Sequence, residues 1–173
     1  MKNLEKNSLI QLLDIIPDKP AQRLLHFCDE NDVLSDILAS YTQEKTYEYQ
    51  LLCCNSSSFE ANKSKYAEQS HISLLKFPLQ RPRYVIQGRD YEFVFVSIAI
   101  AKEERSDFLK KTYELIKHAG NILIFLPKND HTQRYDWLAL LEEQLYVATS
   151  TIDDMFEDYD VLISRRMHGW GSK

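Results

Sequence analysis

Short apolar segments alternate with helix-like segments along most of this chain, and that alternation restricts the fold more than any single motif. The clearest apolar segment is Tyr91–Ile100 (YEFVFVSIAI), which is rich in aromatic and β-branched residues. Such a run is typical of a central strand that is buried on both faces. Four other strands are expected before the last pair, at Arg23–Phe27, Tyr47–Cys54, Ile72–Phe77 and Asn121–Leu126.

Helical periodicity fills the segments between these strands. The spacing of apolar residues predicts helices over Leu4–Ile16, about Asp32–Tyr41, Phe59–Gln69, Glu103–His118 and Arg134–Gln144. Asp32 or Asn31 can cap the second helix, and Gly120 fits a left-handed cap at the end of the fourth. Leu79–Asp90 is polar, contains Pro82 and Gly88, and is expected to form a loop or a short hairpin. Strands that alternate with helices predict a mostly parallel sheet with helices on both faces.

The end of the chain breaks the alternation. Two strands, Tyr146–Ile152 and Tyr159–Arg166, are separated only by the acidic turn Asp153–Asp158. A link this short predicts that the two strands are antiparallel to each other. The length of 173 residues fits one domain, with an N-terminal helix within residues 1–19 and a C-terminal tail at 167–173.

Charge and cysteine content restrict the environment and the partners. The formal net charge is -5, so we expect neither nucleic acid nor an anionic membrane as a partner of the chain as a whole. No apolar run approaches the length of a membrane span, and from the first residues of the sequence we expect no targeting signal. The three cysteines are an odd number, and two of them are adjacent, which favours a reducing, cytoplasmic setting.

The order of elements resembles the class I S-adenosylmethionine-dependent methyltransferase family over about residues 20–166. Tyr91–Ser97 is similar to the fourth strand of that family, and Phe108–Ile124 is similar to the helix, turn and fifth strand that follow. Trp137–Val147 is similar to the helix before the sixth strand. The resemblance implies an α/β, Rossmann-like three-layer sandwich with seven strands, of which the last is antiparallel. It also implies S-adenosylmethionine as the cofactor.

The first half of the chain departs from the family where the cofactor should bind. In the family, a glycine-rich turn after the first strand lets the backbone approach the cofactor. Here the first 87 residues contain no glycine, and Cys28, Glu30 and Asp32 fall on the three glycine positions. The acid that usually binds the ribose corresponds to Asn55. The residues expected at the cofactor site are therefore Phe27, Cys28, Asp29, Glu30, Asp32, Asn55 and Ser97.

These departures lead to two functional hypotheses. The first is a methyltransferase-like protein with a degenerate cofactor site, which binds S-adenosylmethionine weakly or not at all and acts as a binding or scaffold module. The alternative is an active methyltransferase with an atypical cofactor turn. No catalytic residue can be named, because Ser97–Ile100 (SIAI) replaces the N-P-P-Y signature of amino-group methyltransferases. A weaker third hypothesis is a site reused for another nucleotide or metabolite.

Several other clusters of polar residues fit ordinary structural roles as well as functional ones. His26, Cys28, Cys53 and Cys54 could converge, but they lack metal-ligand spacing, so we expect no metal. The acids around Asp29 fit the N-terminus of a helix. A basic loop with one aromatic residue could hold phosphate or RNA, and it contains Arg81, Arg83, Tyr84 and Arg89.

The C-terminal tail is the remaining feature of the sequence. Trp170 stands between two glycines after the basic pair Arg165–Arg166, and such a ring is costly to leave exposed. It can pack on its own domain, cover a pocket, or insert into a partner. We expect a small molecule or a protein as the partner, the latter bound through the Trp170 tail.

Overall fold

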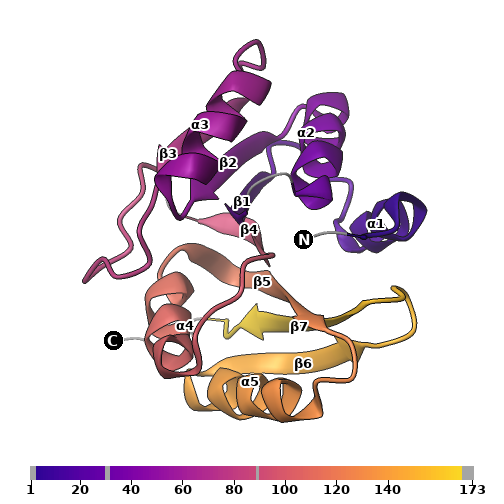
Figure 1. The fold of residues 1–173 in the computed structure, drawn as a ribbon, viewed down its shortest axis with the longest axis vertical. Coiled ribbons are helices and arrows are strands. Elements are labelled where there is room, and N and C mark those ends of the chain that lie inside the picture. The colour runs from indigo at the N-terminus through magenta and orange to yellow at the C-terminus, as the bar shows by residue number, and fades with distance from the viewer. Residues whose placement is uncertain (1–2, 30–31, 89, 169–173) are drawn as a thin grey trace.

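The structure is a computed structural model that describes residues 3–29, 32–88 and 90–168. Within these ranges seven strands form one sheet in the order β3-β2-β1-β4-β5-β7-β6 (Figure 1). β7 is antiparallel to both β5 and β6, and the other pairs are parallel. The strands are β1 (Arg23–Cys28), β2 (Glu48–Cys53), β3 (Ile72–Lys76), β4 (Tyr91–Val96), β5 (Ile116–Pro127), β6 (Tyr146–Ile152) and β7 (Tyr159–Arg166). The predicted Rossmann-like sheet, including its antiparallel last strand, is confirmed.

Helices cover both faces of the sheet. One apolar core lies under α1, α2 and α3, and the second lies under α4 and α5. The helices are α1 (Lys6–Leu12), α2 (Val33–Lys45), α3 (Ser56–Lys65), α4 (Arg105–Tyr113) and α5 (His131–Glu143), with short 3-10 turns at η1 (Leu13–Ile15) and η2 (Lys102–Glu104). None of the helices in the described ranges is long and apolar enough to cross a membrane.

The central strands are apolar because both of their faces are buried. In β4 five of the six residues are buried, and the exception is the half-buried Glu92. β1 lies between β2 and β4, so that His26 stands level with Leu51 on one side and Phe95 on the other. A polar side chain at this place must find its hydrogen bonds inside the protein.

The connection from β3 to β4 has no helix in its described part, residues 77–88 and 90. A parallel crossover usually returns through a helix, but here the chain runs as an extended loop at the side of the sheet (Figure 1). Pro78 and Pro82 disfavour a helix at its start, and Gly88 adopts a positive φ of 82° at its end. The loop alternative of the prediction therefore holds, and part of one sheet face has no helix over it.

The predicted helix over Glu103–His118 is wrong after Tyr113. The helix ends at Tyr113, and β5 already begins at Ile116. Gly120 is not a left-handed cap, because the positive φ of 64° belongs to its neighbour Ala119. Gly120 lies inside the strand, where an added Cβ would be 2.9 Å from the carbonyl oxygen of Lys117. Sheet pairing therefore overrides the helical periodicity of this segment.

Other boundaries shift by a few residues. The helix expected over Leu4–Ile16 is a shorter α-helix continued by the 3-10 turn η1 before Pro17. The helix expected over Phe59–Gln69 starts earlier, at Ser56, because the side chain of Asn55 caps it there. The strand expected over Tyr91–Ile100 ends at Val96.

Candidate functional site

The residues expected to bind the cofactor gather at the carboxyl ends of β1, β2 and β4. Cys28 is paired with Cys53 across β1 and β2, and Phe27 is paired with Val96 across β1 and β4. β1 is followed by a crossover to β2 on one side and lies beside β4 on the other, so this is the edge where the strand order reverses. Open α/β sheets bind their ligands at such a place.

Asp32 occupies this edge with its own side chain. It is 1% exposed, and one carboxylate oxygen accepts a 3.0 Å hydrogen bond from the backbone N–H of Leu34, which caps α2. The other oxygen accepts a hydrogen bond from the hydroxyl of Ser97 at the end of β4. Burial raises the pKa of the Asp32 carboxyl, and these two donors act in the opposite direction. The buried carboxyl group therefore joins the start of α2 to the end of β4.

His26 continues the same network beneath the edge. Its Nε2 lies 2.7 Å from the Ser97 hydroxyl oxygen, and its Nδ1 lies 2.8 Å from the hydroxyl oxygen of Tyr49. Because Ser97 gives its proton to Asp32, Nε2 must donate to Ser97 and Nδ1 must accept from Tyr49. Complete burial lowers the pKa of His26 to about 3, so the imidazole is neutral near pH 7. We call His26, Asp32, Tyr49 and Ser97 the buried network.

The two cysteines at this edge are packed against each other. The sulfur atoms of Cys28 and Cys53 are 3.7 Å apart, and the side-chain amide of Asn62 on α3 donates to both at 3.7–3.8 Å. The hydrogen bond to Cys53 and burial raise the pKa of the Cys28 thiol far above its usual range. Both thiols are buried, which makes them part of the core.

Two more residues of the predicted site, Asp29 and Asn55, are at the same edge, and both are exposed. Asn55 follows β2 as expected, but its side-chain oxygen accepts a 2.8 Å hydrogen bond from the backbone N–H of Ser58. It thereby caps α3 instead of presenting its oxygen to a ribose. Phe27 points the other way, into the core under α4, where its ring is 5.0 Å from that of Phe108.

Several predicted features fall outside this edge or outside the described residues. Glu30, Arg89 and Trp170 are not among the residues that the structure describes. In the basic loop, the side chain of Tyr84 is buried, and the guanidinium of Arg81 lies over the ring of Phe77 at 4.6 Å. The loop therefore does not present Tyr84 as a surface ring for stacking.

Within the described ranges, no group of three or more His, Cys, Asp or Glu side chains is placed to hold a metal ion.

Two members of the buried network are not apparent from the sequence motifs. The sequence places Tyr49 only in a strand, and it associates His26 only with the cysteines. Strand alternation places His26 on the same face as Leu24 and Cys28, and Tyr49 on the same face as Leu51 and Cys53. A polar ring at an apolar position of a strand needs a hydrogen-bond partner inside the protein. The presence of such rings in two neighbouring strands is the sequence signal from which the contact between His26 and Tyr49 could have been predicted.

Comparison with known proteins gives matches at the level of structure. No family model matches this sequence, and no curated protein does. A SAM-dependent methyltransferase from Aquifex aeolicus has a TM-score of 0.75 at 11% identity, over 92% of this chain and 89% of that one. The N-methyltransferase NodS from Bradyrhizobium japonicum WM9 has a TM-score of 0.68 at 11% identity, over 94% of each chain.

Larger proteins with the same domain also match. The chain spans 52% of the CurJ carbon methyltransferase structure and 50% of the citrinin polyketide synthase CMeT domain structure, at 10% identity to each. These identities are too low to transfer a substrate or a catalytic residue, but the agreement in topology covers nearly the whole chain. This chain therefore has the class I S-adenosylmethionine-dependent methyltransferase fold.

Proposed function

We propose that this protein is a methyltransferase-like binding module that does not bind S-adenosylmethionine at the carboxyl edge of its sheet. The observation that supports this most is the buried network. The Asp32 carboxyl group and the Ser97 hydroxyl lie where the chain turns from β1 into α2, and they satisfy each other. A cofactor that approached this turn would have to separate these groups without replacing all of their hydrogen bonds.

The charge of this turn adds to the argument. A helix N-terminus attracts anions such as the carboxylate of the cofactor, because its N–H groups are unpaired. Here the N–H of Leu34, in the first turn of α2, already donates to the carboxyl group of Asp32. A second carboxylate at the same place would compete with Asp32 for this donor. The residues present therefore do not fit the methionine end of S-adenosylmethionine.

The ribose position supports the same conclusion. A cofactor ribose is held by an acceptor at the end of the second strand, and a carboxylate is a stronger acceptor than an amide. Asn55 supplies only an amide, and its oxygen already accepts from Ser58. Ribose binding at this position would compete with the cap of α3.

The alternative, an active methyltransferase with an atypical turn, has one observation in its favour. Asp29 and Asn55 are both exposed at the edge where the cofactor would lie. In this alternative, backbone groups near Cys28–Asp29 and the side chain of Asn55 bind the cofactor, and β4 lines the site. Asn55 would then have to release Ser58, at the cost of the cap.

A binding module needs a partner, and the Trp170 tail is our proposal for the segment that contacts it. Trp170 lies outside the described residues, so the proposal depends on the sequence alone. A Trp170→Ala variant should lose affinity for a protein partner while its unfolding temperature stays unchanged. A drop in that temperature would instead place the ring on the domain itself.

Calorimetric titration of the purified protein with S-adenosylmethionine and S-adenosylhomocysteine tests the main proposal, with an active methyltransferase as a positive control. We expect no saturable heat up to millimolar ligand and no rise in the unfolding temperature. Micromolar binding that is weakened by Asn55→Ala would contradict the proposal and support the active enzyme. The exposed Ser40 on α2 provides a control variant, Ser40→Ala, that leaves this edge intact.

A further inference from the structure

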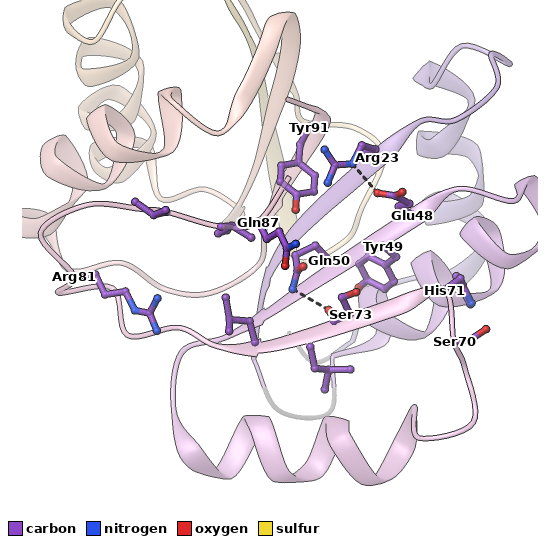
Figure 2. A pocket seen from close by; sticks show the side chains of 14 residues that line it. Arg23, Glu48, Tyr49, Gln50, Ser70, His71, Ser73, Arg81, Gln87 and Tyr91 are labelled. Atoms are coloured by element: carbon purple, nitrogen blue, oxygen red, sulfur yellow. Dashed lines mark hydrogen bonds and ion pairs between the residues drawn. The ribbon is translucent and has the colours of Figure 1, made fainter. Parts of the chain in front are cut away.

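A second site lies on the face of the sheet that the loop between β3 and β4 leaves uncovered. A cavity of about 640 Å³ is bounded by strands β1 to β3 on one side and by this loop on the other (Figure 2). None of the described residues expected at the cofactor turn lines it. Its volume falls in the range of small-molecule sites in proteins, which is roughly 300–1,000 Å³. We call this cavity the loop trough.

The loop trough is polar where the rest of this sheet face is apolar. Successive side chains of a strand point to opposite faces of the sheet. This alternation places Arg23, Glu48, Gln50 and Ser73 on the same face of the sheet as the apolar core under α4 and α5. All four of these residues line the trough. A helix in the β3–β4 crossover would need apolar residues at these positions. The sequence is therefore consistent with a face that stays open to a polar ligand.

One wall of the trough is fixed by a set of close contacts. The guanidinium of Arg23 lies 4.7 Å from the ring centre of Tyr91 and donates a 2.7 Å hydrogen bond to Glu48. Gly88 packs against the same guanidinium so closely that a Cβ there would be 2.1 Å from Nη2. This contact holds the end of the loop, and with it Gln87, beside the strands.

Three uncharged polar groups converge in the middle of the trough. The side chains of Gln50 and Gln87 extend from opposite sides, and the hydroxyl of Tyr91 points toward them (Figure 2). The amide nitrogen of Gln50 donates to the carbonyl oxygen of Ser73 at 3.0 Å, which orients that amide. Across the described part of the chain, no hydrogen bond involves the Gln87 amide or the Tyr91 hydroxyl.

The remaining lining suits a flat, uncharged ligand. Leu75, Val85 and Ile86 supply apolar surface, and the planar guanidinium of Arg81 lies against Phe77 at one end. The charge of Glu48 is balanced by Arg23, so the middle of the trough presents amides and a hydroxyl without a strong net charge. A carboxamide offers a donor and an acceptor in one plane, which is the pattern by which Gln recognises the edge of a nucleobase.

We propose that the loop trough binds an uncharged heterocycle that presents a hydrogen-bond donor and an acceptor on one edge, as a nucleobase does. Gln87 and Gln50 pair with that edge, and the Tyr91 hydroxyl gives a third hydrogen bond. The site is separate from the carboxyl edge of the sheet, since it is built from the first residues of β1, β2 and β4 and the middle of β3. The proposal holds whether or not the carboxyl edge takes a cofactor.

The test is a calorimetric titration of the full chain with adenosine as the probe. We expect saturable binding at micromolar to low millimolar strength. Gln87→Ala and Tyr91→Phe should each weaken it by about 5-fold or more, the effect of one lost hydrogen bond to a neutral partner. Tyr91→Phe keeps the ring under Arg23, and Gln87 is exposed, so neither change should prevent folding. Gln80→Ala removes an amide of the same loop that contacts Glu104 instead, and it should leave the affinity unchanged.

Three further outcomes decide where the probe binds and which ligand class the loop trough prefers. Adenosine binding that is lost in Asn55→Ala but kept in Gln87→Ala would place the ligand at the carboxyl edge and overturn the proposal. Binding of the disaccharide maltose, with no binding of adenosine, would overturn the ligand class. No binding of adenosine, cytidine or guanosine at millimolar concentration would overturn the site itself.

Discussion

His26 Nε2 and Ser97 Oγ are 2.7 Å apart, in a contact that joins neighbouring strands β1 and β4 at the carboxyl edge of the sheet. The two residues are 71 positions apart in the chain and both are buried. Their hydrogen bond connects Tyr49 beneath the edge with Asp32 at the start of α2. These hydrogen bonds join β1, β4 and the start of α2 through the protein's own side chains, and each member of the network can be tested.

Removal of the Ser97 hydroxyl should destabilise the protein. Ser97→Ala leaves His26 Nε2 and one oxygen of the Asp32 carboxyl group without their partner in a buried place. An unpaired buried polar group costs about 1–3 kcal/mol. Chemical denaturation should show a lower midpoint, whereas Ser40→Ala on the exposed face of α2 should unfold like the parent. A Ser97→Ala variant as stable as the parent would mean that the network contributes nothing.

The pH dependence of stability should contain a contribution from His26. Its pKa is about 3 in the folded protein, below the usual 6.5, so between these values the unfolded chain binds the extra proton. Stability therefore rises with pH across that window and is lost as the pH falls through it. Asp32 acts in the opposite direction, because its raised pKa gives stability at low pH that is lost as the pH rises.

The variant His26→Gln separates the two contributions. The slope of its free energy of unfolding against pH, measured from about pH 3 to 6.5, should be less positive than that of the parent, because only the contribution of Asp32 remains. His118 is exposed, and His118→Gln should keep the parent slope. Equal slopes in the parent and in His26→Gln would show that His26 is not buried in its neutral form.

The cysteines should be unreactive in the folded protein. Burial raises the pKa of Cys54 to about 12, and Cys28 and Cys53 are buried against each other. Thiolate is the reactive form, and the hydrogen bond with Cys28 lowers the pKa of the Cys53 thiol, so it is burial that should protect Cys53. Alkylation by iodoacetamide should therefore be slow in native buffer and fast for all three cysteines in denaturant. Peptide mass spectrometry gives the rate at each position. Rapid labelling of Cys53 in native buffer would show that the edge opens readily.

Exchange of their residue types should affect the neighbours Ala119 and Gly120 differently. Gly120→Ala places a methyl group 2.8 Å from the side chain of Ile116 and 3.0 Å from the carbonyl oxygen of Glu92, and overpacking of this kind costs about 1–3 kcal/mol. Ala119→Gly relieves a positive φ of 64° and should be close to neutral. Thermal unfolding of both variants checks this, and a harmless Gly120→Ala would contradict the packing.

The sheet could be predicted from the sequence because local patterns and topology agree over most of the chain. Tyr91–Val96 is apolar on both faces and is a central strand in the structure. The segment 116–118 resembles helix in the sequence because its apolar spacing continues that of α4. Pairing with β4 and β7 decides the conformation of β5, and no local window of sequence contains those partners.

The position of the candidate site in the fold could be predicted from the sequence. The hydrogen-bond partners of its side chains could not. The order of strands places Cys28, Asn55 and Ser97 at one edge, as the structure shows. The partners of each side chain depend on contacts between distant residues, such as His26 with Ser97 and Asp32 with Ser97. The loop trough could not be predicted for a related reason. It forms because the described part of the β3–β4 crossover, residues 77–88 and 90, contains no helix to cover this face of the sheet.

Our proposal that the carboxyl edge does not bind the cofactor can be tested most directly by backbone nitrogen–proton correlation NMR during a titration with S-adenosylhomocysteine. The amides of Cys28, Asp29, Asn55 and Ser97 report on the edge itself, and those of the β6–β7 turn serve as an internal reference. We predict that the signals at the edge stay in place up to millimolar ligand. Saturable shifts confined to these four amides would contradict the account and show that the glycine-free turn still holds the cofactor.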